Sequence, residues 1–187
     1  MHDLIAAAAE LQQFLKERDL RFAFIGGLAN LAWGDPRTTR DVDVSIFATF
    51  GSEGPLVEAL LKRYESRIEH AATFAADNRV LLLRGMGGIP IDVALAAFEY
   101  ESEAISRSRT VDFGRAVCLQ VITAEDLIVM KAFAGREQDW VDVAGVATRQ
   151  FGNLDWPAIH KNAGILAPAA GDPTMQDRLQ KLEQLQP

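Results

Sequence analysis

Two aspartates separated by a single residue, Asp41 and Asp43, constrain the fold of this chain more than any other feature. If residues 41–47 form a strand, both carboxylates project from one face, because side chains alternate along a strand. Val42 and Val44 then point to the opposite face, where they suit a core. Two carboxylates so close together repel each other unless a cation or a basic group lies between them. The pair therefore predicts a strand with a cation-binding face, and a divalent metal ion is the favoured cation.

A Gly-Gly turn precedes the two aspartates. Gly26 and Gly27 follow the apolar run 22–25, which predicts a buried strand, and residues 27–33 favour a helix. Backbone N–H groups at such a strand-to-helix turn, together with the helix dipole, favour the binding of a triphosphate. Most Gly-Gly pairs are only tight turns, and a lone Asp-x-Asp pair is often solvated. The evidence for a site that binds phosphate and metal therefore comes from the order of these features along the chain: strand, Gly-Gly, helix, loop and Asp-x-Asp strand.

A third carboxylate, Asp92, lies within the otherwise apolar run 89–95. A charge inside such a run is costly to bury unless it is paired or binds a metal. Three carboxylates that converge from adjacent strands suit two Mg²⁺ ions, which would bridge nucleotide phosphates and activate an attacking hydroxyl. The alternative is an ordinary ion pair between Asp92 and Arg84.

Hydrophobic periodicity and turn residues predict an α/β (α+β) chain, with a mixed β-sheet flanked by helices and a helical C-terminal part. A catalytic domain is expected over residues 1–122, with a helical region packed on it over residues 123–187. Thr123 followed by Asp126 resembles a capping box and marks the boundary, and residues 164–173 are expected to form a linker. The predicted helices span 3–18, 27–33, 55–64, 98–107, 123–133, 138–149, 156–162 and 174–185, and the predicted strands span 22–25, 41–47, 80–83, 89–95, 111–113 and 116–121.

Composition excludes several classes of protein. The formal net charge of −7 argues against a large sequence-independent DNA-binding surface, which would be basic. Cys118 is the only cysteine, which excludes a disulfide framework and a cysteine-rich zinc site. The longest apolar stretches are too short to span a membrane, and the N-terminus lacks the pattern of a signal peptide. We therefore expect a cytoplasmic protein with no membrane partner.

The residues around the aspartates resemble a known signature. The run Gly26-Gly27-Leu28-Ala29, followed by Arg37-Thr38-Thr39-Arg40-Asp41-Val42-Asp43-Val44, is similar to that of the DNA polymerase β-like nucleotidyltransferase superfamily. Residues 123–131 and 136–142 are similar to later motifs of its AbiEii-type (MenT-like) branch, which includes toxins of bacterial toxin–antitoxin and abortive-infection systems. The resemblance covers residues 22–146 and implies the nucleotidyltransferase fold. Gly27 departs from the pattern, since many members carry serine at that place.

The resemblance also implies roles for individual residues. Asp41 and Asp43 would bind Mg²⁺, and Asp92 would be the third ligand or the base for the acceptor hydroxyl. Lys131 would offset phosphate charge as a point cation, with an exposed helix lysine as the alternative. The implied catalytic residues are Asp41, Asp43, Asp92 and Lys131, and the implied nucleotide-binding residues are Gly26, Gly27, Arg37, Thr38, Arg40, Lys131 and Asp139.

Alternatives remain for the charged residues outside the aspartate triad. Instead of contacting phosphates, Arg37 and Arg40 could balance the charge of nearby aspartates. Asp139 and Asp142 share a helix face at positions i and i+3, so with Arg136 they could form a structural ion network instead of a binding site.

The implied activity is Mg²⁺-dependent transfer of a nucleoside monophosphate from an NTP to a hydroxyl acceptor, with release of pyrophosphate. The acceptor would be tRNA or a protein for toxin-like relatives, with a cognate antitoxin as partner, and an aminoglycoside or lincosamide for antibiotic-resistance relatives. The net charge of −7 favours a small or protein acceptor. A second hypothesis is a non-catalytic protein that binds nucleotide and serves as a partner in a complex. A third hypothesis is an ordinary α/β domain whose acidic residues lie on the surface.

Overall fold

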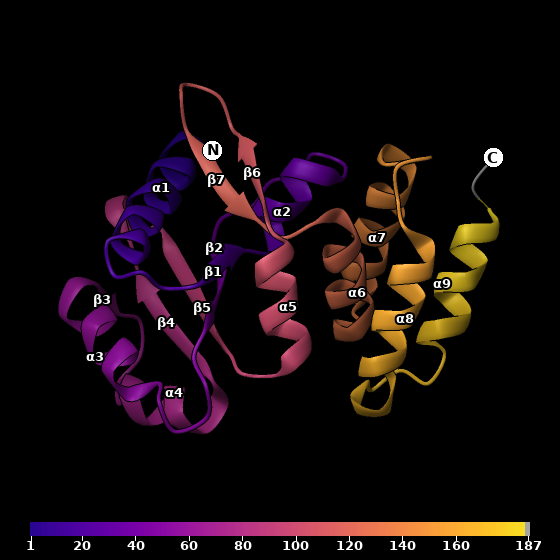
Figure 1. Ribbon diagram of the computed structural model, residues 1–187. Coiled ribbons are helices and arrows are strands. Elements are labelled where there is room, and N and C mark those ends of the chain that lie inside the picture. The colour runs from indigo at the N-terminus through magenta and orange to yellow at the C-terminus, as the bar shows by residue number, and fades with distance from the viewer. Residues whose placement is uncertain (186–187) are drawn as a thin grey trace. The chain divides into compact units, whose positions relative to one another are not determined.

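The computed structural model describes residues 1–185 and confirms the predicted mixed sheet with flanking helices. The chain divides into two compact units (Figure 1). The first comprises residues 1–28 and 38–121, and the second comprises residues 29–37 and 122–187, of which residues 186–187 lie outside the described part. The boundary crosses helix α2 (Gly26–Trp33), so the segment after the Gly-Gly turn belongs to the second unit. The predicted packing of the C-terminal helices on a catalytic domain stays a prediction.

The first unit is built on a seven-stranded sheet with the order β3-β4-β5-β2-β1-β7-β6. The central strand β2 runs parallel to β5 and antiparallel to β1, and β5 is antiparallel to β4. The strands are β1 (Phe22–Phe24), β2 (Val42–Phe47), β3 (Glu65–Ser66), β4 (Val80–Arg84), β5 (Pro90–Ala96), β6 (Arg109–Asp112) and β7 (Cys118–Val121).

Alternation along the central strands sets the two faces of this sheet. Val42, Val44, Ile91 and Val93 are fully buried and form one side of the core, as their spacing predicts. Helices α3 and α4 pack on each other, with α3 against β3 and α4 against β4 (Figure 1). The helices of this unit are α1 (His2–Lys16), α3 (Gly54–Arg63), α4 (Ala71–Asn78) and α5 (Glu99–Arg107).

The second unit is helical. Thr123 caps its first helix as predicted, because its side chain accepts a hydrogen bond from the backbone N–H of Asp126 at 3.2 Å. Met175 and Leu179 of the last helix are buried. The helices that follow Thr123 are α6 (Ala124–Ala134), α7 (Glu137–Arg149), α8 (Trp156–Leu166) and α9 (Met175–Gln184).

Three local features differ from the sequence-based expectations. Strand β3 and helix α4 were not predicted, because a two-residue strand and an eight-residue Ala-rich helix carry little periodic signal. Helix α8 runs on to Leu166, which shortens the predicted linker. Within residues 1–185, no helix has both the length and the apolar character needed to cross a membrane.

Candidate functional site

The sheet brings the three predicted carboxylates together. Asp43 lies on β2 and pairs in register with Asp92 on the parallel strand β5, so their side chains share a face. Asp41 immediately precedes β2 and lies two residues from Asp43 on the same face. One carboxylate oxygen from each of the three lies within 4.8 Å of the other two. All three side chains are half-buried, so the cluster is accessible to a ligand.

The chemistry of this triad fits a divalent cation with a preference for oxygen ligands. Carboxylate oxygens are the ligands that Mg²⁺ prefers in proteins. Burial raises the pKa of Asp92 above its usual value, and the neighbouring charge of Asp41 adds to the effect, while Arg67 opposes it. A divalent ion among the three carboxylates would offset the repulsion that contributes to this raised pKa.

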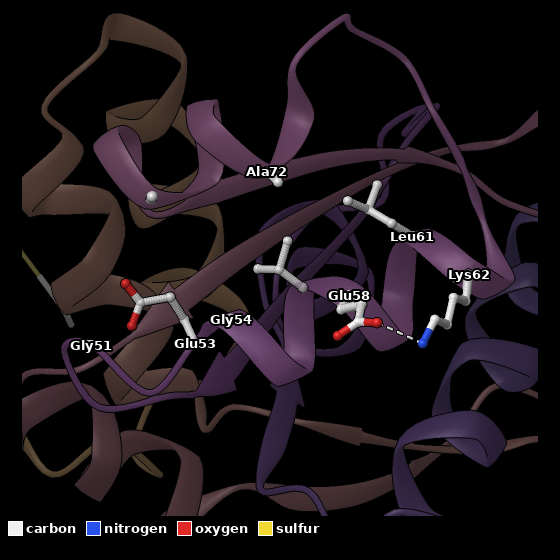
Figure 2. Close-up of a pocket in the computed structure, with 9 residues that line it drawn as sticks. Gly51, Glu53, Gly54, Glu58, Leu61, Lys62 and Ala72 are labelled. Atoms are coloured by element: carbon white, nitrogen blue, oxygen red, sulfur yellow. Dashed lines mark ion pairs between the residues drawn. The ribbon is translucent and has the colours of Figure 1, made fainter.

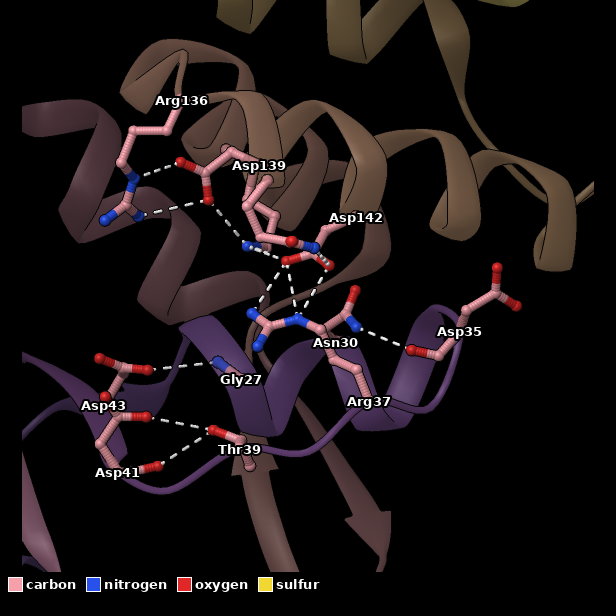
Figure 3. Close-up of polar contacts among 12 residues, drawn as sticks. Gly27, Asn30, Asp35, Arg37, Thr39, Asp41, Asp43, Arg136, Asp139 and Asp142 are labelled. Carbon is pink, nitrogen blue, oxygen red and sulfur yellow. Dashed lines mark hydrogen bonds and ion pairs between the residues drawn. The ribbon is translucent and has the colours of Figure 1, made fainter.

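Neighbouring backbone and hydroxyl groups hold Asp41 and Asp43 in place (Figure 3). The backbone N–H of Gly27 donates to Asp43 Oδ2 at 3.2 Å, and the Thr39 hydroxyl donates to Asp41 Oδ1 at 3.1 Å. Thr39 is 8% exposed, whereas its neighbour Thr38, the predicted nucleotide contact, is exposed. Thr39 was missed because two adjacent threonines in a loop offer no signal that tells them apart. The Gly27 amide predicted to face a triphosphate thus orients a carboxylate in this structure.

Both glycines make room for these side chains. Gly26 has φ of +54°, and a Cβ added there would lie 2.1 Å from Asp43 Oδ2. A Cβ on Gly27 would lie 2.1 Å from Thr39 Oγ1. The close approach explains why two successive residues without side chains precede the aspartates.

Replacing Gly26 by alanine is expected to destabilise the protein by about 2–4 kcal/mol, from left-handed backbone strain plus overlap with Asp43. Gly88→Ala is the matched control, because Gly88 has φ of +77° with no atom within 4 Å of an added Cβ. It should cost only about 1–2 kcal/mol of strain. Urea unfolding of both variants measures the difference, and equal losses would show that the contact with Asp43 is unimportant.

Arg67 also contacts the triad, and no pattern in the sequence predicts this contact. Its guanidinium forms an ion pair with Asp92. Arg84, the partner weighed from sequence, instead lies 3.9 Å from Glu65, so the proposed Asp92–Arg84 pair is wrong. Arg67 follows the unpredicted strand β3, and only the pairing of β3 with β4 brings it to this face.

A second cluster of charges lies within the helical unit (Figure 3). Lys131 on α6 is 6% exposed, so the exposed-lysine alternative is wrong. Its Nζ lies 3.0 Å from Asp139 Oδ1 and 2.6 Å from Asp142 Oδ2. Arg136 binds Asp139 at 2.6 Å, and Arg37 donates to both oxygens of Asp142 at 2.9 and 3.0 Å. The ion network considered for α7 is therefore present, and it includes the lysine predicted to face phosphate.

The two buried carboxylates remain ionised because of these partners. Burial alone would raise the pKa of Asp139, but hydrogen bonds from Arg136 and Lys131 bring it below its usual value. Burial would also raise the pKa of Asp142, but hydrogen bonds from Arg37 and Lys131 bring it below its usual value.

We therefore expect acid to weaken the helical unit. A carboxylate with a lowered folded-state pKa contributes stability above its unfolded-state pKa of about 3.9, and this is lost as the pH falls through the folded value. The free energy of unfolding should thus decline below about pH 4. Urea titrations from neutral to acidic pH test this, and Asp142→Asn should flatten the decline. Asp177→Asn, at an exposed position, should leave its slope unchanged.

The two remaining predicted site residues lie in the loop before Asp41, and one pocket lies in the first unit. Arg40 is exposed in the loop before Asp41, and Arg37 pairs with Asp142. A pocket beside α3 and α4 is lined by Gly51, Glu53, Gly54, Val57, Glu58, Leu61, Lys62, Ala72 and Ala76 (Figure 2). Its charged pair, Glu58 and Lys62, is an exposed helix pair 2.6 Å apart, whereas the triad lies on β2, on β5 and on the residue just before β2.

Comparisons with known proteins identify a family for this chain. The family described as "Nucleotidyltransferase of unknown function (DUF6036)" matches residues 2–166. A comparison with curated proteins finds no match.

Solved structures of nucleotidyltransferases share the fold. An antigenic nucleotidyltransferase-like protein from Paracoccidioides brasiliensis is 17% identical, with a TM-score of 0.56 over 96% of this chain and 93% of that chain. The antibiotic-resistance factor ANT(2″)-Ia is 16% identical, with a TM-score of 0.50 over 96% and 91%. The lincosamide antibiotic adenylyltransferase LnuA, solved with lincomycin bound, is 11% identical, with a TM-score of 0.50 over 74% and 93%. These likenesses confirm the predicted nucleotidyltransferase fold.

Proposed function

The chain belongs to the DUF6036 family of nucleotidyltransferases, and from this premise we propose that it transfers a nucleoside monophosphate from an NTP to a hydroxyl acceptor. The observation that carries the proposal is the triad, in which Asp41, Asp43 and Asp92 offer oxygens within 4.8 Å of one another. Such a cluster of carboxylates on adjacent strands suits metal-assisted phosphoryl chemistry.

In the proposed reaction the acceptor oxygen forms a bond to the α-phosphorus, and the bond from that phosphorus to the bridging oxygen breaks. Pyrophosphate leaves with the electron pair, and the hydroxyl proton passes to a base. Asp41 and Asp43 would hold Mg²⁺, and Asp92 would be either the third ligand or this base, since its carboxylate lies within 4.8 Å of theirs. Two bound Mg²⁺ ions would neutralise phosphate charge and lower the pKa of the acceptor hydroxyl.

Positioning of the triphosphate is the task of the turn at the start of α2. The Gly27 amide donates to Asp43, so this turn fixes a carboxylate beside the place where phosphates would bind. We retain Arg40 and Thr38 as proposed phosphate contacts, since both are exposed in the loop that leads to Asp41. Arg37, Lys131 and Asp139 stay proposed nucleotide-binding residues. Arg37 and Lys131 already pair with carboxylates, so a phosphate would have to compete with those carboxylates, and Asp139 is itself one of the partners of Lys131.

Incubation of the protein with α-phosphate-labelled NTPs, Mg²⁺ and panels of acceptors tests the activity. Transfer of label by the wild type, and its loss in the Asp41→Asn/Asp43→Asn double variant, would support the proposal. Nucleotide binding that survives in this variant, with no transfer by the wild type, would instead favour the non-catalytic nucleotide-binding protein considered above.

The same proposal includes the class of acceptor, and the panels of acceptors should distinguish RNA, protein and small molecules. The AbiEii-type resemblance favours tRNA or a protein, with a toxin–antitoxin role and a cognate antitoxin. The net charge of −7 favours a protein or a small hydroxyl compound such as an aminoglycoside or lincosamide. Label recovered in RNA, in protein or in a small molecule distinguishes the three. The cytoplasmic location stays a prediction.

A further inference from the structure

The sheet places an arginine on the face that carries the triad. The backbone N–H of Arg67, directly after β3, donates to the carbonyl of Leu82 on β4 at 3.0 Å. Leu82 pairs in register with Asp92, and Asp92 pairs with Asp43. Residues directly opposite each other in neighbouring strands share a face. A row of four positions therefore runs from Arg67 through Leu82 and Asp92 to Asp43.

Arg67 uses only part of its hydrogen-bonding capacity. Its Nη2 donates to Asp92 Oδ1, and 24% of its side chain is exposed. Its Nε is buried and has no hydrogen-bond partner among residues 1–185. A buried donor without a partner is unfavourable. The unpaired Nε–H therefore lowers the stability of this arrangement of the guanidinium.

We propose that Arg67 is a displaceable internal cation that occupies Asp92 in the absence of metal and is released when metal binds. This inference rests on the proposed metal-dependent function. A guanidinium and a divalent ion compete for the charge of one carboxylate and also repel each other. The triad carries three carboxylates within 4.8 Å, and Arg67 offsets one of these charges in the described structure. Metal binding therefore has to overcome an ion pair that is already formed.

A different role for Arg67 predicts the opposite sign. If the guanidinium stayed on Asp92 and oriented it as a metal ligand, loss of Arg67 would weaken metal binding. If Arg67 is displaced, its loss removes a competitor and strengthens binding. The sign of the change in metal affinity therefore separates the two roles.

The test uses Mn²⁺ alone as the probe, with the full chain and no nucleotide, and follows binding by paramagnetic resonance or calorimetry. Arg67→Gln should bind Mn²⁺ about tenfold more tightly than the wild type, since one charge-assisted hydrogen bond no longer has to be broken. Arg84→Gln is the matched control. It makes the same charge change on the neighbouring strand β4, where Arg84 pairs with Glu65. Its affinity should match that of the wild type.

Three results would overturn the proposal: unchanged affinity in Arg67→Gln, weaker binding in that variant, or equal tightening in Arg84→Gln. Thermal unfolding checks that each variant is folded. If Arg67→Gln does not fold, Arg67→Met replaces it, and tighter binding is again expected because methionine carries no charge that competes with the metal. Failure of the proposed function looks different: no protein, including the wild type, would bind Mn²⁺, and the Asp41→Asn/Asp43→Asn variant would behave like the wild type.

Discussion

Replacing Asp43 by asparagine is expected to lower the rate of nucleotide transfer by about a thousandfold while the protein stays folded. Asp43 occupies the centre of the triad in sequence and structure, paired in register with Asp92 and two residues from Asp41. Asparagine has the same shape and keeps one oxygen that can accept from the Gly27 N–H. It loses the negative charge, which is the property that a divalent cation requires.

The measurement is the initial rate of label transfer, with thermal unfolding as the check on folding. Asp77→Asn is the matched control, because it makes the same chemical change at an exposed position near the end of α4. That variant should transfer at the wild-type rate. Asp43→Asn within tenfold of the wild type would mean that the triad is not the metal site. A variant that unfolds at a much lower temperature would instead indicate that Asp43 acts through the fold.

The triad could be predicted from sequence because its signals are local. Alternation around Asp43 and the apolar run around Asp92 indicate strands, and the Gly-Gly turn marks the helix start before them. The parallel pairing of β2 with β5, which brings Asp92 beside Asp43, is a long-range property. The sequence predicts that the three carboxylates converge from adjacent strands, but it does not specify this pairing.

Residues held by long-range pairing could not be predicted in the same way. Arg67 reaches Asp92 because a two-residue strand pairs with β4, and so short an element leaves no periodic pattern. The Gly-Gly turn was predicted for phosphate, yet its immediate reason in the structure is the space that Asp43 and Thr39 need. The burial of Lys131 could not be predicted, because α6 carries apolar residues on several faces. Its sequence pattern therefore does not indicate which face is buried.

Replacing Lys131 by methionine is expected to lower the free energy of unfolding by about 3 kcal/mol, the second large effect. Methionine fills much of the same volume but removes a cation that contacts both Asp139 and Asp142. Both carboxylates are almost fully buried, at 3% and 4% exposed, and a buried charge that loses a partner is strongly unfavourable. Arg136 still pairs with Asp139 and Arg37 still pairs with Asp142, which reduces the loss of stability. Neither arginine replaces the Lys131 ammonium between the two carboxylates.

Urea unfolding measures this effect against Lys161→Met, the same change at an exposed position of α8, which should alter stability by less than about 0.5 kcal/mol. A double-mutant cycle with Asp142→Asn then isolates the pair. If Lys131 acts through Asp142, the two losses should fall short of adding by at least about 1 kcal/mol, because either change alone breaks the same contact.

Additive losses, or wild-type stability in Lys131→Met, would contradict a structural role for the cluster. Nucleotide affinity supplies the complementary measurement. The lysine predicted to offset phosphate charge already lies between two carboxylates, which leaves it little net attraction for a further anion. We therefore expect Lys131→Met, measured below its unfolding temperature, to change stability more than nucleotide affinity. If Lys131→Met instead lost much nucleotide affinity and little free energy of unfolding, Lys131 would be a nucleotide-binding residue, as the family resemblance implied.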